Sequence, residues 1–262
     1  IRLVDEMSPD ERPEVEAAAR IITTEGGYFP GFGVVANSTT LASAVEAEAA
    51  AGRGWVKLIG DWPRRGVGPV TNFDQTDLEN VVGIAEAVGA RVAIHAMARD
   101  TPTRAVAAGV HSIEHGLFLS EEDLGHLGAR SGMWVPTLLR TEATAADLAP
   151  GSSGRRRLTE GLAGLRRLLP IAIEAGVMVL TGTDLIGAPR DVAAEALRLA
   201  EFGLNTSQVV AAVSTNGYLA TGRDPGFTPG TTADAVLFSA SPWQDLAVLA
   251  HPHLVVRRGR VL

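Results

Sequence analysis

The stretch "HSIEHGLFLSEEDLGHLGARSGMWVPTL" at residues 111–138 decides the fold, because it contains a strand, a helix and a second strand in succession. The short apolar runs 111–116 and 133–138 are typical of strands that are buried on both faces. Residues 120–132 lie between them and begin with Ser120 and two acidic residues, which is a helix N-terminus signature. Strands of this kind, separated by helices, indicate a parallel sheet covered by helices.

The same alternation recurs along most of the chain. Strands are predicted at 2–5, 20–24, 55–60, 91–96, 111–116, 133–138 and 177–184, and helices at 40–52, 74–89, 120–132, 156–176, 191–203 and 206–221. Seven β/α units in a chain of this length favour an α/β fold of the (β/α)8 TIM-barrel type, of which the first strand is expected to be missing if the family resemblance described below holds. No glycine-rich dinucleotide or phosphate motif follows a strand, which argues against the open doubly wound alternative.

The pattern changes near the C-terminus, where 228–240 and 253–262 are predicted to be strands with turn residues between them. These strands are expected to form a small separate sheet. We therefore predict a barrel domain at 1–225 and the C-terminal part of a small β-sandwich at 226–262.

Composition narrows the classes of partner. The 262 residues include 23 Lys and Arg, 30 Asp and Glu, and no cysteine, with a formal net charge of −7. Without a basic stripe, nucleic acid is not expected as a partner. No apolar run approaches the roughly 20 residues that span a bilayer, so no membrane partner is expected. The absence of cysteine excludes disulfides and thiolate chemistry. We expect a cytoplasmic protein that acts on a small-molecule substrate, and a homo-oligomer is possible.

Four chemically versatile residues lie in or at the end of different apolar strands: Lys57, His95, His115 and Asp184. Each has an ordinary interpretation by itself, such as a hydrogen-bonded core histidine, a lysine that reaches solvent or an aspartate that caps a helix. In a barrel, however, the C-terminal ends of the strands converge at the active site. Nitrogen and oxygen ligands of this kind suit zinc or a similar divalent ion.

These segments resemble the amidohydrolase superfamily, in its imidazolonepropionase-related and prolidase-like branch. The resemblance rests on "WVKLIGDW" 55–62, "VAIHAMA" 92–98, "AGVHSIEHGLFL" 108–119 and "AGVMVLTGTDL" 175–185. The tail 228–262 resembles the closing β-sandwich of the family. The resemblance thus covers nearly the whole chain.

The resemblance implies that Lys57 is carboxylated and bridges two metal ions, because an ammonium group has no lone pair to donate. It implies that His95 and His115 bind the more exposed metal, and that Asp184 binds the more buried metal and transfers protons. The expected cofactor is a divalent metal, most simply zinc, as one or two ions. The expected reaction is hydrolysis of an amide or peptide C–N bond in a dipeptide or N-acyl amino acid by a metal-bridging hydroxide.

The family's His-x-His pair, at the end of the first barrel strand, has no counterpart in this chain, since no histidine precedes Lys57. We expect that a preceding segment of a longer enzyme supplies it. The alternative is a chain that lacks the pair and holds at best one metal through Lys57, His95 and His115. "HPH" at 251–253 lies in the terminal sheet segment and is not expected to replace it.

Five residues near strand ends are candidates for substrate binding: Tyr28, Trp62, Arg64, Thr137 and Arg140. Arg64 or Arg140 could pair with a substrate carboxylate; an ordinary surface arginine is an equally good interpretation. Because side chains alternate along a strand, Glu114 is expected to point away from the face that carries His115.

Two other functions remain open. A mononuclear imidazolonepropionase-like hydrolase or a deaminase is the first, although deaminating relatives place a glutamate three residues after the fifth-strand histidine, where this chain has Ala98. The second is a scaffold or binding protein that kept the barrel and lost catalysis.

Overall fold

The computed structural model describes residues 2–8, 12–184, 192–226 and 228–262. The chain forms two compact units, residues 1–132 and 133–262, which are described separately below. None of the helices in the described ranges is long and apolar enough to cross a membrane.

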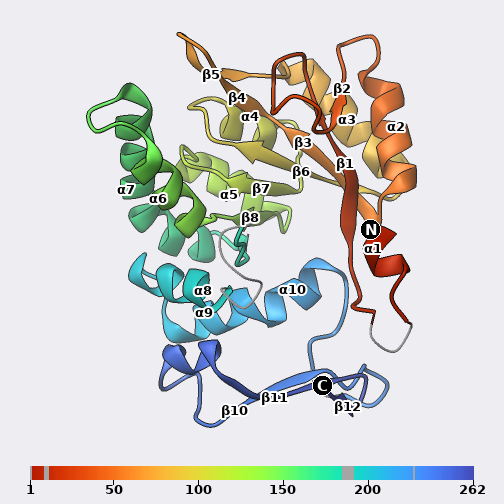
Figure 1. Cartoon of the computed structure of the whole chain (residues 1–262), viewed down its shortest axis with the longest axis vertical. Coiled ribbons are helices and arrows are strands. Elements are labelled where there is room, and N and C mark those ends of the chain that lie inside the picture. Colours follow the sequence, from red (N-terminus) through yellow and green to blue (C-terminus); the bar gives the residue numbers. More distant parts are fainter. Residues whose placement is uncertain (1, 9–11, 185–191, 227) are drawn as a thin grey trace. The chain divides into compact units, whose positions relative to one another are not determined.

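The first unit is built on parallel strands in the order β2-β1-β3-β6-β7 (Figure 1). The strands are β1 (Ala17–Thr23), β2 (Val34–Val35), β3 (Gly54–Ile59), β6 (Arg91–Ala96) and β7 (Ser112–His115). The helices are α1 (Arg2–Asp5), α2 (Leu41–Ala51), α3 (Gln75–Ala87), α4 (Thr101–Ala107) and α5 (Glu121–Ala129). An antiparallel hairpin of β4 (Asp61–Arg64) and β5 (Gly68–Thr71) follows β3.

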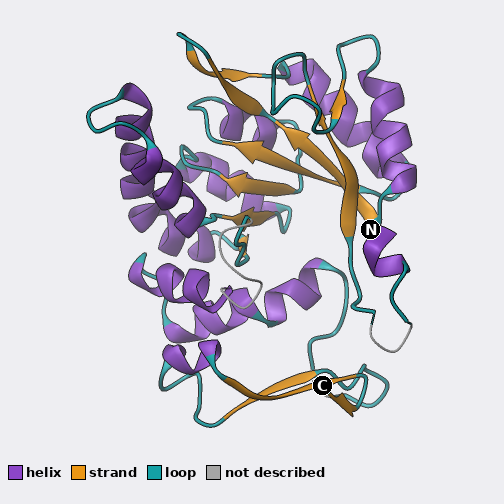
Figure 2. Ribbon diagram, viewed as in Figure 1, coloured by secondary structure: helices purple, strands orange, loops and turns teal. Residues whose placement is uncertain are grey.

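The two faces of this sheet differ in polarity. Side chains on one face are completely buried, among them Val56, Leu58, Val92, Ile94 and Ile113. Right-handed crossovers between neighbouring parallel strands place the connecting helices on the same side. Helices α2, α3 and α4 contact the strands accordingly (Figure 2). The apolar face is therefore the core of the unit, and the alternate residues remain for chemistry on the other face.

Helix starts follow the sequence closely. Ser120 accepts a hydrogen bond from the Asp123 amide, and the Asp123 carboxylate accepts one from the Ser120 amide, forming a reciprocal capping box. Asp74 caps α3 through the Asp77 amide. The predicted helix N-terminus at Ser120 is confirmed.

The strand predicted at 2–5 is wrong, because these residues form helix α1. Apolar residues stand at positions 1, 3, 4 and 7, a spacing of three and four residues that suits a helical turn as well as a short strand. In so short a segment, periodicity alone could not separate the two conformations.

In the second unit, β8 (Met133–Val135) pairs in parallel with β9 (Met178–Val179). The helices are α6 (Leu138–Asp147), α7 (Ser153–Glu174), α8 (Val192–Glu201), α9 (Thr206–Val213), α10 (Thr215–Ala220) and the 3-10 helix η2 (Leu246–Ala250). The strand predicted at 177–184 is shorter than expected, and the helix predicted at 206–221 divides at Ser214. Residue 191, the expected start of the preceding helix, lies outside the described ranges.

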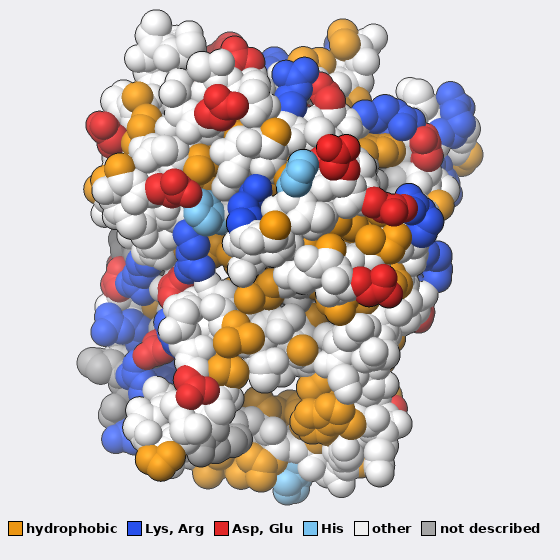
Figure 3. All heavy atoms as spheres, turned by 180° about the vertical axis from the view of Figure 1, so that it is seen from behind, with side chains coloured by type: hydrophobic (Ala, Val, Ile, Leu, Met, Phe, Trp, Pro, Cys, Tyr) orange, Lys and Arg blue, Asp and Glu red, His pale blue; other side chains and the backbone are white. Residues whose placement is uncertain are grey.

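The terminal segment forms an antiparallel sheet of β10 (Ala235–Phe238), β11 (Pro252–Arg257) and β12 (Arg260–Val261). This confirms the strands expected within 228–240 and 253–262, while the domain boundary at residue 226 stays a prediction. On the face drawn in Figure 3, Lys and Arg side chains are interspersed with Asp and Glu.

Candidate functional site

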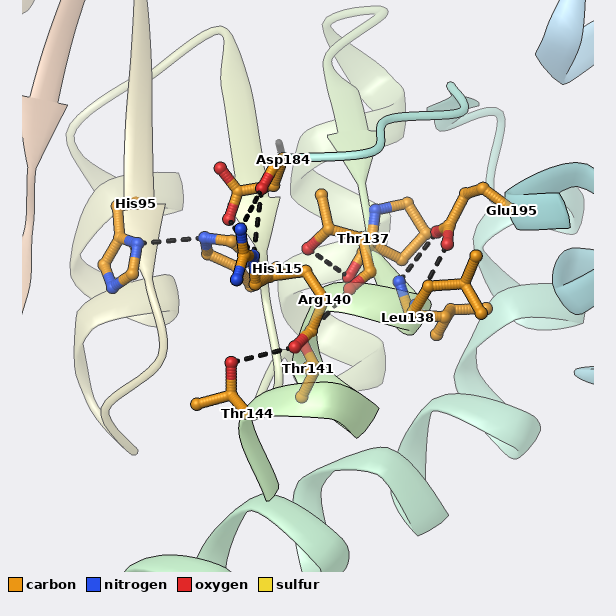
Figure 4. A network of polar contacts seen from close by, with 11 residues as sticks. His95, His115, Thr137, Leu138, Arg140, Thr141, Thr144, Asp184 and Glu195 are labelled. Carbon is orange, nitrogen blue, oxygen red and sulfur yellow. Dashed lines mark hydrogen bonds and ion pairs between the residues drawn. The ribbon is translucent and has the colours of Figure 1, made fainter. Parts of the chain in front are cut away.

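Two of the predicted ligands, His95 and His115, lie against each other in the first unit. His95 Nδ1 and His115 Nε2 are 2.9 Å apart, and the ring centroids are 4.5 Å apart (Figure 4). His115 is 4 % exposed and the His95 side chain 13 %. This histidine pair therefore presents one ring nitrogen from each residue to a common point in a mostly buried setting.

The backbone of His115 makes the contact possible. In the β6–β7 register, His115 lies opposite Ala96, whose side chain is on the buried apolar side. A regular strand would therefore turn His115 away from His95. Instead, His115 has a φ of 65° and is followed by Gly116 at 61°, which ends the strand and redirects the ring. A left-handed conformation costs a residue with a Cβ roughly 1–2 kcal/mol, a strain that is often found at functional sites.

The expectation that Glu114 points away from the histidines is wrong. Glu114 is in register with His95 and therefore lies on the same face of the sheet. Its carboxylate accepts a hydrogen bond from the Ser112 hydroxyl at 2.7 Å. The alternation rule failed because His115, and not Glu114, departs from regular strand geometry.

Lys57 shares this face as well. It is in register with Ala93, two residues before His95 on the same strand, and it is half-buried. Lys57, His95 and Glu114 therefore come from three neighbouring strands on one side of the sheet. The structure brings the predicted lysine and both predicted histidines to one surface of the unit.

Asp61 is a site residue that the sequence reasoning missed. It is 1 % exposed, and its Oδ2 accepts hydrogen bonds from the amides of Met97 and Ala98, each at 2.8 Å. Its Oδ1 lies 3.9 Å from His95 Nε2, within ion-pair range. A carboxylate on the Nε2 side favours a proton there, so that the lone pair of Nδ1 is directed at His115 Nε2. The acid directly after "LIG" at the end of β3 was the available signal.

Gly60 lets the chain pass close to His95. Its amide donates to the His95 carbonyl at 2.9 Å, and a Cβ at residue 60 would lie 2.6 Å from that oxygen. A side chain here would displace the end of β6. The glycine therefore allows residue 60 to approach the end of β6 at His95 closely.

The histidine pair fits part of a divalent metal site. Two imidazole nitrogens bound to one tetrahedral zinc at 2.0–2.1 Å lie about 3.3 Å apart, close to the observed separation of 2.9 Å. Among the described residues, no group of three or more His, Asp or Glu side chains is arranged to hold a metal. A further oxygen ligand would come from Lys57 only if it were carboxylated.

Of the predicted substrate residues, Trp62 lies beside this pair and Tyr28 contacts Trp62, whereas the guanidinium of Arg64 binds protein oxygens. The rings of Tyr28 and Trp62 are 4.6 Å apart, and Trp62 is 5.9 Å from the ring of His95. Arg64 donates to the Glu25 carbonyl at 2.7 Å and to Asn72 Oδ1 at 3.1 Å. Its guanidinium thus holds the segment after β1 against the hairpin.

In the second unit, Asp184 lies in a turn beyond the short β9, with a φ of 44° and a side chain that is 46 % exposed. Strand pairing ends early because the Thr181 amide turns to the Ala212 carbonyl. Arg140 donates to the Asp184 main-chain carbonyl from Nε at 2.9 Å and from Nη2 at 2.7 Å (Figure 4). Its Nε is 3.5 Å from the Asp184 carboxylate.

Thr137 is buried, and its hydroxyl donates to the neighbouring Pro136 carbonyl, while its φ of 47° starts helix α6. Glu195 from α8 caps this helix by accepting from the amides of Leu138 and Leu139 at 2.7 and 3.0 Å. Burial raises the pKa of Glu195 above its ordinary value, and the two amide hydrogen bonds oppose the rise. Glu195 therefore fixes the start of the helix that carries Arg140.

The remaining histidines have other surroundings. His111 Nδ1 accepts from the Val92 amide at the beginning of β6, and burial lowers the pKa of this imidazole. His126, His251 and His253 are exposed.

Comparison with known proteins identifies the class. The profile of the Amidohydrolase family matches residues 23–262, so the chain belongs to this family. Uncharacterized proteins of Mycobacterium bovis and Mycobacterium tuberculosis are 32 % identical over 260 residues, which cover 96 % of this chain and 70 % of theirs. A crystal structure of an amidohydrolase is 25 % identical with a TM-score of 0.82, covering 96 % of this chain and 70 % of that one.

Two other solved structures share the fold. One is a Xaa-Pro dipeptidase with bound methionine in the active site, with 22 % identity, a TM-score of 0.81 and coverage of 96 % and 68 %. The other is an ochratoxinase of A. niger, with 20 % identity, a TM-score of 0.82 and coverage of 95 % and 66 %. The fold is thus the α/β TIM-barrel type of the amidohydrolases. The protein is therefore a member of the amidohydrolase family, a hydrolase acting on carbon–nitrogen bonds.

Proposed function

We propose that the protein hydrolyses an amide or peptide C–N bond in a small substrate of the dipeptide or N-acyl amino acid type. His95 and His115 would hold a divalent metal, most simply zinc, together with a carboxylated Lys57. The observation that carries this proposal is the 2.9 Å approach of His95 Nδ1 to His115 Nε2 on a face shared with Lys57.

The amidohydrolase family is generally metal-dependent, and a bound divalent ion would supply a hydroxide at neutral pH and polarise the scissile carbonyl. The chain's own residues prepare for this. Asp61 lies on the Nε2 side of His95, so that Nδ1 of His95 faces His115. The turn at His115 directs the Nε2 atom of His115 to the same point.

Asp184 is proposed to accept the proton of the attacking water and to deliver it to the leaving amine. This role, and its proposed ligation of a second metal, rest on the resemblance of "VLTGTD" to the family's eighth-strand segment. The guanidinium of Arg140 supports this role, because it binds the Asp184 main-chain carbonyl and leaves the Asp184 carboxylate half-exposed.

Residues with strained backbones support the assignment. Among the described non-glycine residues, those with positive φ are His115, Ser131, Thr137, Asp184 and Arg258. Three of these five are predicted site residues: His115 is the last residue of β7, Thr137 follows β8 and Asp184 follows β9. Such strain is retained where the surrounding structure requires it, as it is at active sites.

The first test is the metal content of the full-length protein, measured by inductively coupled plasma mass spectrometry for wild type and His115→Asn. Asparagine tolerates the left-handed backbone and should keep the fold. We expect the variant to lose metal and to lose hydrolysis of a dipeptide panel. His126→Asn, which alters an exposed histidine on α5, is the matched control and should keep both.

The number of metal ions per chain separates the two-metal hydrolase, the mononuclear hydrolase and the scaffold protein. Two ions per chain, with loss of activity in Lys57→Ala and a gain with added bicarbonate, would support a carboxylated lysine bridge. One ion, with activity unaffected by Lys57→Ala, would instead support the mononuclear hydrolase. A full-length wild type without metal or hydrolysis would contradict the proposal and favour the scaffold.

We further propose a small molecule as the partner, without nucleic acid or membrane, and a cytoplasmic location. The mixture of Lys and Arg with Asp and Glu side chains on the face in Figure 3 supports the proposal that nucleic acid is not a partner. Cell fractionation and light scattering would test location and the possible homo-oligomer.

A further inference from the structure

Four aromatic side chains form a cluster in the first unit: Tyr28, Phe29, Phe32 and Trp62. Three belong to the segment between β1 and β2, and Trp62 belongs to β4. The Phe29 ring centroid lies 5.0 Å from Tyr28, 4.8 Å from Trp62 and 6.4 Å from Phe32. All of these contacts are edge-on, a favourable geometry for aromatic pairs.

This aromatic cluster adjoins the histidine pair. Trp62 is 5.9 Å from the His95 ring, which is in turn 4.5 Å from His115. Ring contacts thus run without interruption from Phe32 to the proposed metal ligands. A substrate side group bound on the aromatic cluster would therefore lie next to a scissile bond held at the histidine pair.

The outer rings of the cluster remain accessible. Phe29 is 56 % exposed and Phe32 65 % exposed. Burial of a large apolar side chain stabilises a fold, and these two rings realise only part of that stabilisation. An accessible apolar surface beside a polar site is typical of ligand recognition.

The segment that carries the rings is held in place by polar contacts. Asn72 donates from Nδ2 to the carbonyls of Gly27 and Ile59, at 3.0 and 2.8 Å. A Cβ at Gly27 would lie 2.6 Å from Asn72 Oδ1, so the segment packs closely against this amide. With Arg64 on the Glu25 carbonyl, the cluster is arranged in advance, which lowers the ordering cost of binding.

We propose that the aromatic cluster is a substrate subsite for an aromatic or large aliphatic group attached next to the scissile C–N bond. An apolar occupant fits because the cluster offers ring faces, while the guanidinium of Arg64 is bound to Glu25, Thr24 and Asn72. The inference rests on the proposed function and deepens it by naming the substrate class.

The test compares kcat/KM for pairs of dipeptides and N-acyl amino acids that differ only in phenylalanine or alanine at one position. One series varies the acyl side and the other the amine side. We expect wild type to prefer phenylalanine by about tenfold or more in one series. Phe29→Ala and Phe32→Ala should reduce this ratio toward one.

The matched control is Trp243→Ala, an aromatic side chain that is 60 % exposed in the second unit. It should keep the wild-type ratio. Equal rates for the phenylalanine and alanine substrates in wild type would overturn the subsite and leave the hydrolase intact. An altered oligomeric mass in Phe29→Ala, with an unaltered ratio, would instead make the cluster an interface between copies and likewise overturn it.

A binding measurement separates this inference from the proposed function. Calorimetric titration of the full-length protein with N-acetyl-phenylalanine amide and N-acetyl-alanine amide needs no turnover. Tighter binding of the phenylalanine compound, lost in Phe29→Ala, supports the subsite even if no hydrolysis is found. Equal binding of both compounds by wild type contradicts it.

Discussion

His95 and Asp184 both come from strand-and-turn segments that carry predicted ligands, and the chain holds them by different means. The His95 ring contacts His115 and lies in ion-pair range of Asp61, and its side chain is 13 % exposed. Asp184 is held mainly through its main-chain carbonyl by Arg140, and its side chain is 46 % exposed.

The difference predicts which variants lose stability together with activity and which lose activity alone. Where side chains support one another in a buried network, removing one leaves the others without partners, and the fold loses free energy together with function. Where the main chain is held, a side chain can be exchanged with little effect on the fold. The four experiments below test this contrast, beginning with the largest expected effect.

Asp184→Asn should lower kcat by about 10²–10⁴-fold, because an amide cannot accept and return a proton. Its unfolding free energy should stay within about 0.5 kcal/mol of wild type, since Arg140 binds the carbonyl that both residues share. Steady-state kinetics and chemical denaturation measure the two quantities. Asp147→Asn, an exposed aspartate on α6, is the control, and a large loss of stability in Asp184→Asn would break the contrast.

Asp61→Asn should weaken metal binding by about 10–100-fold. The amide oxygen can still accept from Met97 and Ala98, but its NH2 group would face His95 Nε2 and favour the tautomer that protonates Nδ1. Zinc titration against a competing chelator measures the change. The exposed Asp100→Asn should bind as wild type, and an Asp61→Asn protein with unaltered affinity would remove the positioning role.

Arg140→Lys should reduce kcat by about tenfold with little change in KM, because one ammonium group cannot reproduce the two-pronged contact with the Asp184 carbonyl. Arg156→Lys is the matched control, since Arg156 also binds a main-chain carbonyl, that of Gly151. If both lysine variants lost activity equally, the effect would be one of general stability and not of Asp184 placement.

Glu195→Gln is expected to have the smallest effect of the four variants, a change in the pH dependence of the unfolding free energy. The pKa of Glu195 is raised in the folded chain, so between the unfolded and folded pKa values the folded state binds more protons. Stability from this group therefore falls as pH rises through that window, by about 1.4 kcal/mol for each pH unit between the two values. Denaturation from pH 4 upward should show this slope in wild type and in Glu174→Gln, but not in Glu195→Gln.

Regular features of the fold were predictable from local pattern. Apolar runs located β3, β6 and β7, and Ser120 marked the start of α5, because strand burial and helix capping depend on nearby residues. His95 and His115 were found for the same reason: polar residues at the ends of apolar strands stand out in the sequence.

Features that depend on backbone departures or on distant partners could not be predicted. The left-handed turn at His115 reversed the expected positions of Glu114 and His115 relative to the sheet. The buried position of Asp61 could not be predicted, because its amide donor, Met97, lies 36 residues further along the chain. Arg64 and Arg140 stay candidates for substrate binding, while their carbonyl partners, Glu25 and Asp184, could not be predicted because they are far away in the sequence.

The close passage of Gly60 by the His95 carbonyl has a consequence for directed evolution. A Cβ there would meet the backbone oxygen of His95 and the side chains of Ile94 and Thr101 at once, all within 2.7 Å. Libraries that randomise this stretch will therefore return glycine at residue 60 whatever substrate is selected for. Trp62, two residues later, has ring contacts with Tyr28, Phe29 and His95, and under the proposed subsite it is the position at which selection would reshape specificity.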